Sequence, residues 1–324
     1  MGPITILQSC RIRAGLANPA LAFPPGRKEP LVVQSLREAV GEPPNGLVRL
    51  SLPVRQRCFR DTPMDSNVEK LAGLVSHAKR IVVFSGAGIS TESGIPDFRG
   101  PGGVWTKYDP SEFYIDRFLA SEESRKRYWM RTTDMYRDIA KAAPNAAHYA
   151  VAELERQGRL GAVITQNVDG LHQAAGSSAD KVVELHGTHR YVSCLSCGQS
   201  HPRDAYQRLV SPQGDAPNCE RCGGLMKPAT ISFGQMLKPE TLDRAARETR
   251  CCDLFLVVGS SLVVYPAAGF PLLAVEQGAP LAIVNLQETP HDGHAAVIVR
   301  AAAGETLRRV MQALAQDVPA PLPN

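Results

Sequence analysis

Residues 81–99 read IVVFSGAGISTESGIPDFR. The first four are apolar, which predicts a buried strand of a parallel sheet. The strand leads into Gly86 and Gly88, and a glycine-rich turn after a strand is where α/β proteins bind phosphate groups. Gly-x-Gly alone is more often an ordinary strand-to-helix turn, and Thr91 stands where the dinucleotide fingerprint has its third glycine. The continuation at 95–99 adds an apolar residue, a proline, an acid, an aromatic ring and a cation, which is more chemistry than a turn requires.

The composition is that of a globular protein. The 324 residues are 44% hydrophobic and 21% charged, enough for one large α/β domain with an insertion or for two domains. The net charge of +4 is mild and the basic residues are not clustered, so we expect no direct binding of nucleic acid. No apolar run reaches the length of a membrane span, and we expect no membrane partner.

The first 64 residues differ from the rest. They are rich in Pro and Gly, show no sustained period, and contain no acid before Glu29. We interpret them as a disordered extension or as the result of an upstream start, with Met64 as the natural beginning. An organelle transit peptide is the alternative interpretation. The ordered part is predicted to begin at Asp65, with Ser66 and Glu69 as a capping box.

Strands and helices then alternate along the chain. Apolar runs predict strands at 81–84, 160–165, 182–185, 254–258, 281–284 and 297–299. Helices are predicted between them, including 146–157 and 239–250. This order predicts an α/β fold with a doubly wound parallel (Rossmann-like) sheet, whose ligands bind beyond the carboxyl ends of the strands. We assign residues 65–100, 144–189 and 228–318 to this domain, 101–143 to a helical insertion, and 190–227 to a zinc-binding module.

The zinc assignment rests on two Cys-x-x-Cys pairs. Each pair offers two thiolates on one turn, and two such turns close a tetrahedral site. Because four sulfurs leave no open position, the Zn²⁺ is predicted to be structural. Two disulfides or a redox-active pair are the alternatives, and a reducing compartment disfavours the former. The predicted ligands are Cys194, Cys197, Cys219 and Cys222.

Polar residues follow several of the predicted strands. His186 ends one strand, and a histidine there can act as a general base near neutral pH, although a lone histidine is more often structural. Gln166, Asn167 and Asp169 end the preceding strand and are expected to face the same crevice. The late strands end in small polar residues suited to the adenosine half of a dinucleotide, namely Gly259, Ser260, Ser261 and Asn285.

Taken together, these segments resemble the sirtuins, the NAD-dependent protein deacylases. The similarity covers about residues 65–318 and lies in GAGISTESGIPDFR at 86–99, TQNVDGLH at 165–172, ELHG at 184–187, the cysteine pairs, SFGQ at 232–235 and VVGSSLVVYPA at 257–267. The residues of the first two motifs resemble those of the class II branch, which includes mitochondrial sirtuins and their bacterial relatives. The resemblance implies one structural Zn²⁺ and NAD as a co-substrate that is consumed.

The resemblance also implies roles for single residues. His186 would be the base that activates a ribose hydroxyl, with Asn167 and Asp169 orienting ribose and nicotinamide and Gln166 contacting ribose. The nicotinamide side would be bound by Ile95, Asp97, Phe98 and Arg99. The pyrophosphate would be bound by the loop residues Gly86, Ala87 and Gly88. The adenosine side would be bound by Gly259, Ser260, Ser261, Asn285 and Ala303. The acylated protein segment would add as a strand between Phe233-Gly234 and Val263-Val264.

Acyl preference has one further candidate signal. Tyr128 and Arg131 have the spacing with which the desuccinylase branch binds an acidic acyl group, and residues three apart share a helix face. The alternative is a surface arginine beside a core tyrosine.

The predicted function is therefore NAD-dependent deacylation of protein lysines, by a monomer in the cytoplasm, or in the mitochondrial matrix if the N-terminal segment is a transit peptide. Mono-ADP-ribosyl transfer to protein uses the same cofactor site and is the first alternative. A Rossmann dehydrogenase and a non-catalytic binding module are weaker ones, since the acid expected after the second strand of a dehydrogenase is missing and a binding module needs no base at His186.

Overall fold

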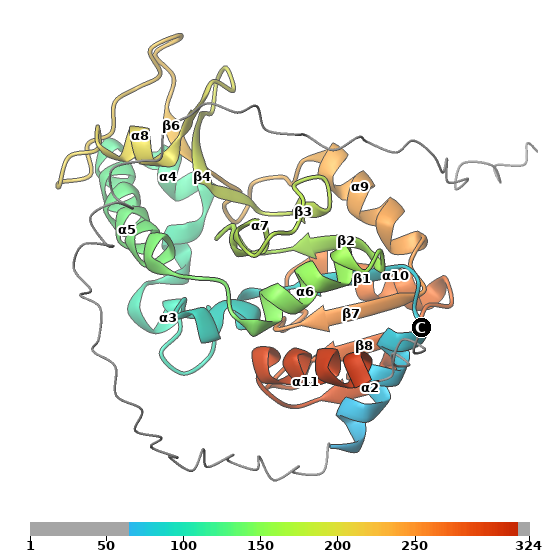
Figure 1. Cartoon of the computed structure of the whole chain (residues 1–324). Helices are drawn as coiled ribbons and strands as arrows, with labels where there is room; N and C mark the ends of the chain where they lie inside the picture. Colours follow the sequence, from blue (N-terminus) through green and yellow to red (C-terminus); the bar gives the residue numbers. More distant parts are fainter. Residues whose placement is uncertain (1–64, 317–324) are drawn as a thin grey trace, which may run out of the picture. The chain divides into compact units, whose positions relative to one another are not determined.

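The computed structural model describes residues 65–316, so the predictions for residues 1–64 lie outside the described part. Its centre is a six-stranded sheet in the order β3-β2-β1-β7-β8-β9, in which all neighbours are parallel (Figure 1). The strands are β1 (Ile81–Ser85), β2 (Leu160–Thr165), β3 (Val182–Glu184), β7 (Leu254–Val258), β8 (Leu281–Val284) and β9 (Val297–Val299). The predicted doubly wound sheet is thus confirmed, and its strand order reverses between β1 and β7.

Helices cover both faces of this sheet because successive strand residues point to opposite sides. Ile81 and Val83 pack under α2 (Ser66–His77), α6 (Ala146–Arg156) and α11 (Ala303–Gln316). Val82 and Phe84 pack on the other side, against the cluster that includes α9 (Pro239–Arg250) and α10 (Phe270–Glu276). Each fully buried side chain of this size contributes about 1.5–3 kcal/mol, so the two layers fix the strand ends firmly.

Helix ends follow local capping chemistry. The cap of α2 is Asp65, whose carboxylate accepts from Asn67 N at 2.9 Å. The predicted capping box of Ser66 and Glu69 is therefore wrong by one residue, because an aspartate directly before the serine is an equally good cap. At α6 the cap is Asn145, which forms a capping box with His148. That helix is followed by Gly158 at φ 70°, a conformation that favours glycine after a helix.

A smaller unit consists of the insertion and the cysteine-containing segment. The insertion folds into α3 (Val104–Lys107), η2 (Pro110–Phe113), α4 (Ile115–Ala120) and α5 (Glu122–Lys141). The second segment is a three-stranded antiparallel sheet in the order β5-β4-β6 with α8 (Arg203–Gln207). Its strands are β4 (Gly187–Cys194), β5 (Ser200–Pro202) and β6 (Met226–Thr230). The two segments share one core built around Trp129, Phe118 and Tyr206, and Figure 1 shows α5, α8 and β4 side by side.

The remaining elements are short: η1 (Ala87–Ser93), α7 (Leu171–Ala174), η3 (Ala267–Gly269) and η4 (Asp292–His294). No helix within residues 65–316 is long and apolar enough to cross a membrane. Cys252 is partly buried against the sheet, and Cys251, at the C-terminal cap position of α9, is exposed.

Candidate functional site

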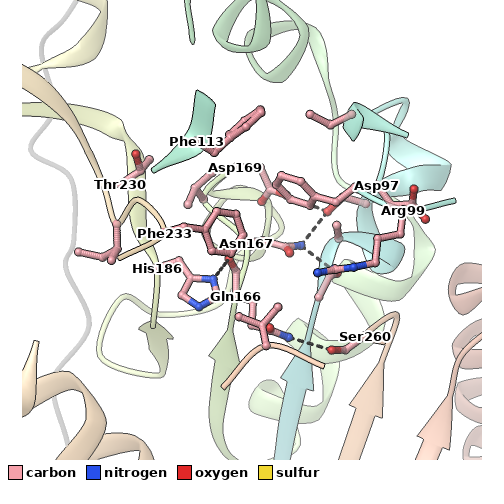
Figure 2. Close-up of a pocket in the computed structure, with 18 of the residues that line it drawn as sticks. Asp97, Arg99, Phe113, Gln166, Asn167, Asp169, His186, Thr230, Phe233 and Ser260 are labelled. Carbon is pink, nitrogen blue, oxygen red and sulfur yellow. Dashed lines mark hydrogen bonds between the residues drawn. The ribbon is translucent and has the colours of Figure 1, made fainter. Parts of the chain in front are cut away.

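A cleft of about 580 Å³ opens at the carboxyl ends of the strands, between the large sheet and the smaller unit. Figure 2 shows how side chains from distant segments converge there. The predicted site residues in its lining are Gly86, Ala87, Gly88, Ile95, Asp97, Phe98, Arg99, Tyr128, Gln166, Asn167, Asp169, His186, Phe233, Gly234, Gly259, Ser260, Ser261, Val264 and Asn285. Three predicted residues do not line the cleft: Arg131, Val263 and Ala303.

The glycine-rich turn packs against the turn after β7, at the point where the strand order reverses. Gly86 N donates to Val258 O at 3.1 Å and Gly88 N donates to Gly259 O at 2.9 Å. A Cβ at Gly86 would lie 2.7 Å from Gly259 O, and one at Gly259 (φ 63°) would lie 2.2 Å from Ile89 N. Both turns therefore need glycine, and this bare backbone next to a sheet edge suits a pyrophosphate.

A chain of three polar side chains joins the ends of β1 and β2. Asn167 Nδ2 donates to Gly86 O at 3.1 Å and lies 3.2 Å from Ser90 Oγ. Ser90 Oγ in turn donates to Asp169 Oδ2 at 2.8 Å, while the other carboxylate oxygen accepts from Leu171 N. Asn167 and Asp169 are thus held in fixed positions at the cleft. Sequence reasoning gave Ser90 no role, although its burial (1% exposed) within a loop could have suggested one.

His186 is held by a main-chain oxygen. Its Nδ1 lies 3.1 Å from Gln166 O. Since a carbonyl only accepts, Nδ1 carries the proton and donates, which leaves Nε2 with its lone pair. Burial lowers the pKa of His186 below its ordinary value, and the bond to Gln166 offsets this in part. The ring is therefore neutral at pH 7, as a general base must be.

Two further histidines are buried beside the ends of β1 and β2. His148 and His172 are buried and stack edge to face at 5.1 Å. His172 Nε2 lies 2.9 Å from Ser85 Oγ, which donates to Thr165 Oγ1 at 2.8 Å. Burial lowers the pKa of His148 to about 4 and that of His172 to about 3. Both histidines therefore have a structural role.

The loop after η1 is shaped by aromatic contacts. Asp97 Oδ1 accepts from Gly100 N at 2.7 Å, which closes the turn. Phe98 and Phe233 both contact Trp105, at 5.9 and 6.4 Å between ring centroids, and the Arg99 guanidinium lies 4.1 Å above the same indole. Trp105 is thus the common contact of Phe98, Arg99 and Phe233, and the sequence contained no signal for this beyond its place in the insertion.

On the other side of the cleft, Gln166 Nε2 donates to Ser260 Oγ at 2.8 Å and Asn285 Nδ2 donates to Gln287 O at 2.8 Å. Phe233 is fixed through its main chain, since its N–H donates to Phe113 O and its carbonyl accepts from Ile115 N. The residues predicted to bind adenosine, ribose and nicotinamide are therefore in one cleft, apart from Ala303, which is buried at the start of α11.

The four predicted zinc ligands also lie together. Their Sγ atoms are all within 4.8 Å of one another, with separations of 3.5 Å between Cys194 and Cys222 and 3.6 Å between Cys197 and Cys219. A tetrahedral Zn²⁺ with bonds of about 2.3 Å requires sulfurs about 3.8 Å apart. These separations are far longer than a disulfide bond. The four residues fit one structural Zn²⁺.

Comparison with known proteins agrees with this geometry. Residues 86–266 match the model of the Sir2 family. An NAD-dependent protein deacetylase 1 of Bradyrhizobium diazoefficiens is 50% identical over 242 residues, which cover 75% of this chain and 94% of the relative. The chain belongs to the Sir2 family. An NAD-dependent protein deacylase 2 of Archaeoglobus fulgidus is 43% identical over 250 residues, covering 77% of this sirtuin and 96% of the relative.

Solved structures of Sir2 enzymes match as well. One, described for the mechanism and regulation of Sir2 enzymes, superposes on this sirtuin with a TM-score of 0.70 and 42% identity, and covers 78% of this chain and 99% of its own. Another contains a deacetylated p53 peptide and 3′-O-acetyl-ADP-ribose, with a TM-score of 0.70, 40% identity and coverage of 76% and 98%. The family match, the fold and the four-cysteine cluster thus all support the same assignment, to the Sir2 family.

Proposed function

We infer that this sirtuin is an NAD-dependent protein lysine deacylase in which His186 is the general base. The observation that carries the assignment of the base is the bond from His186 Nδ1 to Gln166 O, because it fixes the tautomer with a free Nε2 in the cleft. Catalysis needs this group neutral, and burial keeps it so.

NAD, when bound, supplies a ribose carbon that becomes electrophilic as nicotinamide leaves. The chain's own residues orient and protect that centre. Asn167 and Asp169 are fixed through Ser90 and orient the ribose and the carboxamide. His186 Nε2 accepts a proton from a ribose hydroxyl, and Phe98 and Phe233, packed around Trp105, keep water away from the reacting carbon.

The acylated protein segment is proposed to lie as a strand between residues 233–234 and 263–264. Gly234 and Val264 line the cleft on its two sides. Val263 is 46% exposed outside the lining, so it is placed to contact the segment beyond the acyl-lysine.

We propose that the acyl group is uncharged. Helix α5 presents one stripe to the cleft, consisting of Tyr128, Thr132, Met135 and Ile139, with the acid Asp138 beside it. Arg131 is outside the lining: it is 6% exposed, donates from Nη2 to Glu112 O at 2.7 Å, and its guanidinium lies 4.2 Å from the Phe113 ring centroid and 5.3 Å from that of Tyr128. Arg131 is therefore a buried arginine that joins η2 to α5, and not a surface arginine. A succinyl carboxylate would therefore meet Asp138 and no available guanidinium on this helix.

Turnover of one peptide carrying either acetyl- or succinyl-lysine tests this preference. We expect kcat/KM for the acetyl peptide to be larger by about tenfold or more, a difference of roughly 1.4 kcal/mol. Arg131→Met, with its melting temperature recorded, should leave that ratio within about twofold. A succinyl preference that Arg131→Met abolishes would contradict the proposal.

Further properties are proposed on the sequence alone. The motifs at 86–99 and 165–172 favour the class II branch, and we propose a monomer located in the cytoplasm. We also propose the division into a large domain (65–100, 144–189 and 228–318), a helical insertion (101–143) and a zinc module (190–227). Mono-ADP-ribosyl transfer is the second candidate activity, and it predicts a protein product that retains the ADP-ribose.

A further inference from the structure

One carboxylate outside the cleft joins two parts of the cofactor site that lie 212 residues apart in the sequence. Glu92, in η1, accepts a hydrogen bond from Gly304 N at 2.6 Å. Gly304 is the second residue of α11, and the first N–H groups of a helix have no partner within it. A carboxylate there satisfies one such donor and interacts favourably with the positive end of the helix dipole.

The two residues fit each other closely. A Cβ at Gly304 would lie 2.8 Å from Glu92 Oε1 and 2.9 Å from Oε2. Any side chain at 304 would therefore displace the carboxylate. Glycine in a helix interior costs about 1 kcal/mol relative to alanine. The close approach of the Glu92 carboxylate explains why glycine nevertheless occupies position 304.

Both ends of this contact lead into the cleft. On the side of η1, Gly88 and Ser90 line the cleft, and Gly88 N is bonded to Gly259 O. On the side of α11, Arg300 donates from Nη1 to Gln287 O at 2.9 Å and to Asn285 O at 3.4 Å, and both of these residues line the cleft. Glu92 thus connects the glycine-rich loop to the N-terminus of α11, and the chain just before that helix contacts residues 285 and 287.

The fold of η1 does not depend on this contact alone. Asn145 Nδ2 donates to Ile89 O at 2.7 Å and to Ser93 Oγ at 3.0 Å, which anchors the same segment to α6. Glu92 itself is exposed and does not line the cleft. Its loss should therefore alter the placement of the loop more than the stability of the protein.

We propose that Glu92 is a positioning residue for NAD, which sets the separation between the glycine-rich loop and the Asn285–Gln287 side of the site through the N-terminus of α11. The proposal rests on the use of NAD by this sirtuin, and it concerns cofactor affinity, not the chemical step.

Glu92→Ala is the first variant, measured by steady-state kinetics and by calorimetry with ADP-ribose. We expect KM for NAD and Kd for ADP-ribose to rise about fivefold, the effect of roughly 1 kcal/mol, with kcat changed less than about twofold. Glu69→Ala is the control, since Glu69 is also an exposed glutamate but lies in the first turn of α2 and does not line the cleft. It should leave both constants unchanged.

Gly304→Ala completes the test. In the wild-type background its methyl displaces the carboxylate, so KM for NAD should rise about as much as in Glu92→Ala, about fivefold. In the Glu92→Ala background it should add no further rise, and the melting temperature should increase because alanine is the better helix former.

An unchanged KM and ADP-ribose Kd in Glu92→Ala would overturn the proposal. An equal rise caused by Gly304→Ala in both backgrounds would do so too. The calorimetric arm does not require turnover. A wild-type protein that binds ADP-ribose but removes no acyl group would therefore contradict the proposed function while the role of Glu92 is still measured.

Discussion

Gln166 Nε2 donates to Ser260 Oγ over 2.8 Å, and so links the end of β2 to the end of β7 across the intervening strand β1. Figure 2 shows this bond beneath Asn167 and His186. The loop that follows β1 is thereby enclosed by its two neighbours. This enclosure explains why Gly86 and Gly259 tolerate no side chain.

Gly259→Ala should prevent the two turns from packing together. The new Cβ would lie 2.2 Å from Ile89 N at a φ of 63°, and we expect the free energy of unfolding to fall by at least about 2 kcal/mol. ADP-ribose binding should be lost. Urea denaturation and calorimetry measure both effects. Gly269→Ala, where no atom lies within 4 Å of the new methyl, is the control and should be nearly neutral. Equal behaviour of the two variants would refute the packing argument.

The pH dependence of activity should reflect His186. A general base works in its neutral form, and burial lowers the pKa of His186 below 6.5. At saturating NAD, kcat/KM for the acylated peptide should therefore be level from about pH 6.5 upward and fall in more acid solution. Initial rates across this range measure it, over the pH interval in which the protein remains folded. A rate that still rises between pH 7.5 and 8.5 because of a protein group would argue against this assignment.

Stability should depend on pH through His148 and His172. Their pKa values are about 4 and about 3 in the folded protein, below the ordinary value of 6.5. A depressed pKa means that the unfolded chain binds more protons, so the contribution is complete above pH 6.5 and is lost as the pH falls toward 4. Each histidine should lower the free energy of unfolding by about 1.4 kcal/mol per pH unit well below pH 6.5. His172→Gln should reduce this slope in urea titrations. An identical slope in the variant would show that other groups cause the acid lability.

Zinc should be required for the fold of the smaller unit. Since the sulfur positions fit one tetrahedral ion and the β4-β6 sheet is built around them, removal of the metal should cost several kcal/mol, on the order of what structural zinc sites contribute. We expect one Zn²⁺ per chain by elemental analysis, and a lower melting temperature after chelation or in Cys219→Ser. A chelated protein with unchanged melting temperature and activity would be incompatible with a structural role.

Much of the large sheet could be predicted because its strands are buried on both faces. The apolar runs at 160–165, 254–258, 281–284 and 297–299 coincide with β2, β7, β8 and β9. The segment after Ser261 was harder to predict. It forms η3 and then α10, which begins only at Phe270, because Leu262 adopts φ 53° and the segment turns before it becomes helical.

The site residues on strand ends were also predictable, because parallel strands bring their carboxyl ends to one edge. Contacts that depend on packing between distant segments were not. The burial of Arg131 results from the position of Phe113 in η2, and the contact of Glu92 with Gly304 joins segments that have no common sequence pattern. Ser90 was missed because its partners, Asn167 and Asp169, lie on another loop.

The most direct test of the central claim is the analysis by mass of products formed from NAD and an acetyl-lysine peptide. We predict equal amounts of nicotinamide, deacetylated peptide and O-acetyl-ADP-ribose with the wild-type sirtuin. His186→Ala should reduce product formation at least about a hundredfold, as expected for loss of a general base, while ADP-ribose binding persists. Deacetylation at the wild-type rate in His186→Ala, or nicotinamide release with the ADP-ribose attached to protein and no deacetylated peptide, would contradict the account.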